Sequence, residues 1–157
     1  MNTSASLEKL ASFCKSLRDS ELRTLALLGC PMKIRKSRHF FQLEVTVRGH
    51  VDNELPPDSR ISCKMVFMCP KFYPRSLPEV HIRSKKNFPD YLESVIYSEY
   101  ERVTHLYRGS QYIIPMVSSA LYMIEREERK FVHAIGSVVF QMSQEICKPS
   151  RVAQRLV

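Results

Sequence analysis

The sequence predicts an α+β domain in which helices gather on one face of an antiparallel meander of three or four strands. Apolar residues recur at steps of three and four near both ends of the chain, which is typical of amphipathic helices. In the middle of the chain they alternate with polar residues, which is typical of half-buried strands. Six of the nine prolines lie between positions 56 and 89, where they mark the connections between strands.

The composition is that of a single globular domain. The chain has 157 residues, of which 44% are hydrophobic and 25% are charged. No apolar run reaches the roughly 18 residues of a membrane-spanning helix, and the N-terminus does not resemble a signal peptide. The five cysteines include no C-x-x-C pair, so neither a disulfide framework nor a zinc site is supported. We therefore expect a cytoplasmic or nuclear protein with reduced thiols, no cofactor and no membrane association.

The first helix is predicted over residues 4–28. Its apolar face consists of Leu7, Leu10, Cys14, Leu17, Leu25 and Leu28. Glu21 interrupts this face, and Asp19 is suited to cap a second, shorter helix. Gly29, with Pro31 just beyond it, predicts where the helix ends.

Three strands are predicted next. The clearest covers residues 41–47, where apolar and polar residues alternate. A second covers residues 61–69, and Cys63 and Cys69 lie on its apolar phase as small buried residues. A third, shorter strand covers residues 79–83.

Helical spacing returns in the last third of the chain. The segment 90–108 gives no settled prediction, whereas residues 111–132 predict a helix. A further amphipathic stripe follows, formed by Ile135, Val138, Val139, Met142 and Ile146. We therefore expect a folded domain over residues 5–132, and an amphipathic helix with a basic tail over residues 133–157.

A YPxxxP motif lies between the second and third strands, formed by Tyr73, Pro74 and Pro78. With the order of elements around it, the motif resembles the RWD domain, a non-catalytic relative of ubiquitin-conjugating enzymes. The resemblance implies a fold like that of those enzymes. Two prolines impose consecutive turns, and the tyrosine ring packs beneath them while its hydroxyl meets a free backbone group. We therefore predict a structural role for the motif.

The resemblance argues against catalysis by this chain. Active conjugating enzymes carry an HPN motif and then a cysteine after the YP segment. Here residues 87–92 read Asn-Phe-Pro-Asp-Tyr-Leu, and no cysteine occurs between Cys69 and Cys147. The chain also has no nucleophile elbow, phosphate-binding loop or HExxH helix, and its five histidines are scattered. No catalytic, cofactor-binding or metal-binding residue is predicted.

The charge of the chain is concentrated in the predicted sheet. The formal net charge is +8, and residues 29–89 hold twelve basic residues against five acidic ones. The densest basic positions are Lys33, Arg35, Lys36, Arg38, Lys85 and Lys86. A basic surface attracts nucleic acid, acidic lipid or an acidic protein, although a solvated loop is the favoured explanation of either run taken alone.

These observations support three hypotheses. The first is a protein-interaction adaptor, which the resemblance places in ubiquitin-like conjugation or in stress and translation signalling, with a ubiquitin-pathway enzyme or a kinase as partner. Its candidate partner surface is the stripe over residues 135–146, unless that stripe packs back on the same domain. The second is binding of nucleic acid or another acidic surface through the basic segment. The third is a catalytically inactive cofactor of a ubiquitin-conjugating enzyme.

Overall fold

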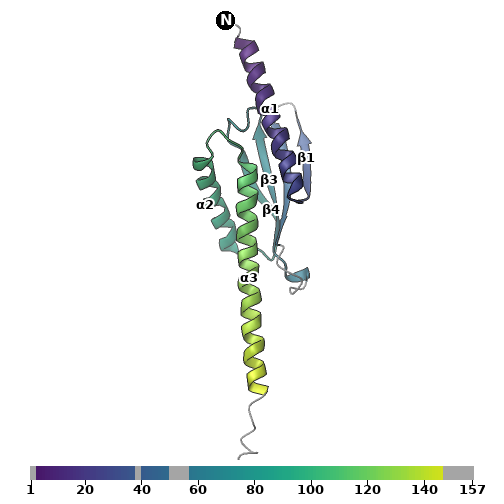
Figure 1. The fold of residues 1–157 in the computed structure, drawn as a ribbon, viewed down its shortest axis with the longest axis vertical. Coiled ribbons are helices and arrows are strands. Elements are labelled where there is room, and N and C mark those ends of the chain that lie inside the picture. Colours follow the sequence, from purple (N-terminus) through teal and green to yellow (C-terminus); the bar gives the residue numbers. More distant parts are fainter. Residues whose placement is uncertain (1–2, 38–39, 50–56, 147–157) are drawn as a thin grey trace, which may run out of the picture.

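The structure, a computed structural model, describes residues 3–37, 40–49 and 57–146. Its elements are α1 (Thr3–Leu27), β1 (Met32–Lys36), β2 (Phe40–Arg48), the short 3₁₀ helix η1 (Pro57–Ser59), β3 (Ser62–Pro70), β4 (Glu79–Lys86), α2 (Asp90–Leu106) and α3 (Ile113–Ile146). The strands form one antiparallel sheet in the order β1-β2-β3-β4. The helices cover one face of this sheet, which gives the two layers of the predicted α+β fold (Figure 1).

The core lies between the helices and the inner face of the sheet. Leu43, Phe67 and Val80 are paired across β2, β3 and β4, and all three are buried. These residues are covered by Leu25 of α1, Ile96 of α2 and the inward side of α3. The alternation predicted for residues 41–47 is confirmed, because alternate residues of β2 are buried.

Lys33, Arg35 and Lys36 of the densest basic run lie in a strand that the sequence analysis did not predict. In β1, Lys33 pairs with Glu44 and Ile34 pairs with Leu43. This strand lies at the edge of the sheet, and a charged edge discourages pairing with other chains. Only two of its residues, Met32 and Ile34, are apolar. The three basic residues therefore obscured the alternation that would have predicted a strand.

The first helix is continuous and includes no second helix beginning at Asp19. α1 runs through Asp19 and Glu21 and ends where predicted, with Gly29 in the left-handed region at φ +75°. Glu21 lies inside this helix with its side chain buried, because the carboxylate has hydrogen-bond partners in other parts of the fold.

The unsettled segment 90–108 contains α2. This helix begins directly after Pro89, and Leu92, Ile96 and Val103 form its buried face. The strand before it is longer than predicted, because β4 continues to Lys86.

The last helix is longer than the sequence suggested. α3 is one helix of 34 residues, about 50 Å long at about 1.5 Å per residue, and the predicted boundary between residues 132 and 133 falls inside it. Ion pairs along the charged run favour its continuation, with Lys130 Nζ 3.1 Å from Glu127 Oε1. Figure 1 shows that its C-terminal half extends beyond the sheet and the other helices. No helix among the described residues is apolar and long enough to cross a membrane.

Candidate interaction surfaces

The YPxxxP motif lies at the centre of a buried hydrogen-bond network. Tyr73, Pro74 and Pro78 are buried in the β3–β4 connection, and the Tyr73–Pro74 peptide bond is cis. The Tyr73 hydroxyl donates to Glu21 Oε2 at 2.7 Å. The same hydroxyl oxygen accepts hydrogen bonds from the backbone N–H groups of Tyr112 at 2.7 Å and Ile113 at 3.1 Å.

This network satisfies the N-terminus of α3. Glu21 Oε1 accepts from the backbone N–H of Ile114 at 2.9 Å, and the next residue is Pro115, which has no N–H. The backbone N–H of Met116 then donates to the Tyr112 carbonyl. The first turn of a helix leaves such donors without intrahelical partners, and here α1 and the YPxxxP connection supply the acceptors. The motif therefore holds α1, the β3–β4 connection and α3 together.

Burial shifts the titration of both side chains in this network. Burial raises the pKa of Glu21, although hydrogen bonds from Tyr73 and from the backbone of α3 oppose the shift. Burial and the adjacent Glu21 carboxylate raise the pKa of Tyr73. The sequence analysis treated Glu21 only as an interruption of the apolar face of the first helix. A single acidic residue on an apolar helix face was the feature that could have indicated its buried role.

The described thiols lie in the hydrophobic core. Cys14, Cys30, Cys63 and Cys69 are buried. Burial raises the pKa of Cys63 and of Cys69 to about 12, with a smaller contribution from nearby carboxylates. Because the thiolate is the nucleophile, these two cysteines are poorly suited to thioester chemistry. Cys147 lies outside the described residues.

The predicted basic residues do not gather on one surface. Successive residues of a strand point to opposite faces. Lys33 and Arg35 are paired with Glu44 and Gln42 on the face without helices, whereas Lys36 is paired with the inward-facing Phe41.

The second basic run lies at the other end of the sheet. Lys86 pairs with Ser62 at the start of β3, while Phe41 pairs with Cys69 near the end of the same strand. Lys85 forms an ion pair with Glu93 of α2. Arg38 lies outside the described residues.

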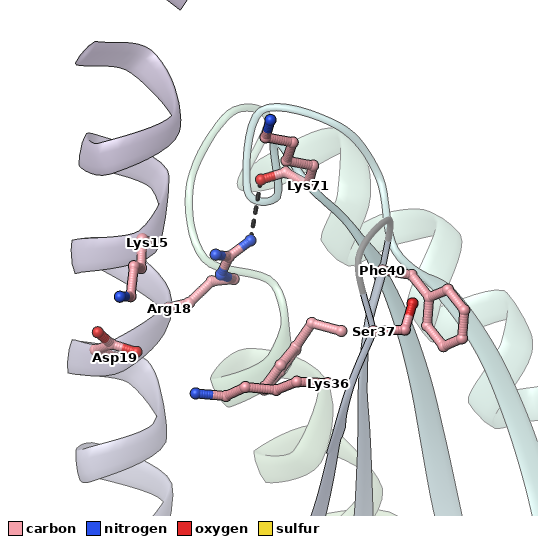
Figure 2. A pocket seen from close by; sticks show the side chains of 8 residues that line it. Lys15, Arg18, Asp19, Lys36, Ser37, Phe40 and Lys71 are labelled. Carbon is pink, nitrogen blue, oxygen red and sulfur yellow. Dashed lines mark hydrogen bonds between the residues drawn. The ribbon is translucent and has the colours of Figure 1, made fainter. Parts of the chain in front are cut away.

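Lys36 instead lines a cleft between α1 and the β1–β2 hairpin, which we call the basic cleft (Figure 2). The cleft encloses about 290 Å³ and is lined by Lys15, Arg18, Asp19, Lys36, Ser37, Phe40, Phe41 and Lys71. Arg18 Nη1 donates to the Lys71 carbonyl at 2.9 Å, and its guanidinium lies 5.9 Å from the centre of the Phe41 ring. Sequence reasoning missed this site because its cations come from three distant segments.

The predicted apolar stripe lies on the projecting half of α3. Met142 is 58% exposed there. The backbone of Ile135, Val138, Val139 and Ile146 is helical, but their side chains are outside the described set. Phe131, nearer the body of the domain, is 49% exposed.

A pocket lies at the base of this projecting half. It encloses about 610 Å³, and its lining includes Pro89, Tyr91, Glu127 and Phe131. The Tyr91 hydroxyl donates to Glu127, which fixes α2 against α3 beside the pocket. Among the described residues, no cluster of side chains is suited to hold a metal ion.

Two comparisons with known proteins bear on identity. The RWD domain family matches residues 16–122, an interval that runs from α1 into α3 and contains the whole sheet and the YPxxxP motif. A comparison with curated proteins gives no match. The matched interval covers more than half of the chain and coincides with the helix, the meander and the packed helices described above. The chain therefore belongs to the RWD domain family of protein-interaction modules, which share the α+β fold of ubiquitin-conjugating enzymes.

Proposed function

We propose that this protein is a non-catalytic adaptor that binds a protein partner through the projecting half of α3. The observation that supports this most directly is the length of α3 beyond its last buried residue. Glu128 is that residue among the described ones, and the helix continues to Ile146, about five further turns.

The projecting half contributes little to the described core. The buried residues of α3 lie between Ile113 and Glu128, and beyond them Phe131 and Met142 are exposed. A helix that extends alone into water is marginally stable, and an amphipathic one gains stability when a partner covers its apolar side. The pocket at its base adds a concave surface that an apolar side chain of the partner can enter.

The proposed pathway is the one that the resemblance to the RWD domain implies. We propose that the partner is a ubiquitin-pathway enzyme or a kinase of stress and translation signalling, and that the protein works in the cytoplasm or nucleus. The buried thiols with raised pKa values support a role without thioester transfer. An inactive cofactor of a ubiquitin-conjugating enzyme is one form of this adaptor.

Affinity purification followed by mass spectrometry at low and high salt tests the proposal. Three variants are compared with the wild type: deletion of residues 133–157, Met142→Asp, and the control Gln144→Asp. Met142 and Gln144 are both exposed, and two positions apart on a helix they lie on nearly opposite sides. We expect the deletion and Met142→Asp to lose the salt-resistant partners, and Gln144→Asp to keep them.

Stability measurements separate docking from folding. Because the deletion removes no described core residue, we expect its thermal unfolding to stay close to that of the wild type. A gross loss of stability would show that the segment belongs to the core. Partners that survive the deletion would refute docking through α3, and recovery only of salt-sensitive nucleic-acid complexes would favour the second hypothesis.

A further inference from the structure

The basic cleft concentrates positive charge between two elements of the fold. Lys15, Arg18 and Asp19 lie within about one turn of α1, and Lys36 ends the strand that faces them. Figure 2 shows the Lys36 side chain extending from the hairpin toward α1. Asp19 is the one acidic residue in the lining, which holds four basic residues: Lys15, Arg18, Lys36 and Lys71.

The cations of the cleft lack the acidic partners that other basic residues have. Elsewhere, the Lys64 and Lys85 ammonium groups lie 3.3 and 2.5 Å from carboxylate oxygens of Glu44 and Glu93. Among the described residues, the ion pairs include none formed by Lys15, Arg18 or Lys36. The cleft therefore has positive charge that is not neutralised within the described chain.

Arg18 is held in place before any ligand binds. Its Nη1 donates to the Lys71 carbonyl at 2.9 Å, and Phe41 lies beneath the guanidinium. Such contacts reduce the side-chain entropy that is lost on binding. The remaining N–H donors of a guanidinium match the geometry of a phosphate group, and the lysines add point charges around it.

We propose that the basic cleft binds the phosphate group of a phosphorylated segment of a partner protein. A phosphorylated side chain carries about −1.5 to −2 charges at pH 7 and several strong acceptor oxygens. A cluster with four cations and one acid matches that charge better than it matches a single carboxylate. The enclosed volume of about 290 Å³ suits one side chain.

The placement of the other basic residues favours a peptide over nucleic acid. Nucleic-acid binding requires a continuous basic track along the phosphate backbone. Here Lys33 and Arg35 lie on the opposite face of the sheet, and Lys85 and Lys86 lie at its other end. The positive charge near the cleft is therefore local.

This proposal concerns a second surface, separate from the projecting half of α3. It deepens the adaptor proposal, because the ligand is again part of a protein partner, and it adds regulation by phosphorylation. The experiment uses the whole chain and does not alter α3, so its failure leaves docking through α3 untouched.

The test is an NMR titration of the ¹⁵N-labelled full chain at constant ionic strength. The probes are N-acetyl-phosphoserine methylamide, its serine and glutamate counterparts, and an oligothymidylate. The variants are Arg18→Lys and the double variant Lys15→Gln/Lys36→Gln. The matched control is Lys9→Gln/Lys33→Gln, which removes the same charge from exposed positions of α1 and β1 outside the cleft.

We expect saturable shifts of the amides lining the cleft with the phosphoserine probe. Binding weakens about five-fold or more in Arg18→Lys and in Lys15→Gln/Lys36→Gln, because each loses charge-assisted hydrogen bonds. It stays unchanged in the control variant. The proposal is wrong if the cleft amides do not shift, if the serine or glutamate probe binds equally well, or if the control weakens binding equally. Binding of the oligothymidylate alone would also overturn it and assign the cleft to nucleic acid.

Discussion

The Tyr73 hydroxyl is the group whose removal tests the buried network most directly. Tyr73→Phe keeps the aromatic ring and removes one oxygen, so no large cavity forms. Three hydrogen bonds are lost: one to Glu21 and two from the backbone of Tyr112 and Ile113. At about 1 kcal/mol for each lost bond, we expect the free energy of unfolding to fall by about 3 kcal/mol.

Tyr112→Phe is the matched control. Tyr112 is another fully buried tyrosine, but its hydroxyl makes one described hydrogen bond, accepted from the backbone N–H of Gly109 at 2.9 Å. We therefore expect this variant to lose about 1 kcal/mol. The two substitutions remove the same atom, so the difference between them isolates the network around Tyr73.

Urea denaturation followed by far-ultraviolet circular dichroism measures both variants. With an m value of about 2 kcal/mol/M, a loss of about 3 kcal/mol shifts the midpoint by about 1.5 M. If Tyr73→Phe and Tyr112→Phe destabilise the domain equally, the network does not hold α1 and α3 together as we infer. A double-mutant cycle with Glu21→Met, which removes the acceptor oxygens, then measures the coupling between the two side chains, and additivity would contradict the direct hydrogen bond.

Three further predictions follow from buried groups. Burial raises the pKa of Glu21 above its usual value near 4.5, so its contribution to stability is present below about pH 4.5 and declines as the pH rises through the folded-state pKa. Urea titrations should show the wild type losing stability relative to Glu21→Gln as the pH rises above about 4.5, and parallel curves would contradict this. In Gly49→Ala the new Cβ would overlap the Glu128 carboxylate, so we expect a loss of about 1–3 kcal/mol, which Glu128→Ala should partly relieve in the double variant. Cys63 and Cys69, with pKa values of about 12, should resist iodoacetamide in the native protein and react in urea. Peptide mass spectrometry measures the labelling, and rapid labelling of the native protein would show that the two thiols are accessible.

Local patterns predicted most of the fold. The alternation along β2 and the helical spacing in α1 and α3 identified the α+β class, since the period of apolar residues reflects the geometry of each backbone type. Two elements, β1 and α2, were not predicted. β1 has mostly exposed and charged side chains, and α2 has a buried face of only a few residues within a mixed sequence.

The candidate surfaces were predicted less completely. The projecting half of α3 follows from an apolar stripe in the sequence, although the sequence suggested a separate helix. The basic residues near position 35 were identified as candidates. The pleat of the strand nevertheless places Lys33 and Arg35 on the opposite face of the sheet from Lys36. Lys15 and Arg18 reach Lys36 only because α1 packs beside the hairpin.

The sequence by itself determined the class of fold, the order of the elements other than β1 and α2, and the RWD motif around Tyr73. Those properties depend on residues close together in the chain, through backbone geometry and turn formation. The tertiary structure decided that Glu21 satisfies the first turn of α3, and that cations from distant segments converge on one cleft. A buried hydrogen bond or a cluster of like charges arises from packing between elements. The spacing of apolar residues within one element does not indicate which other elements it will contact.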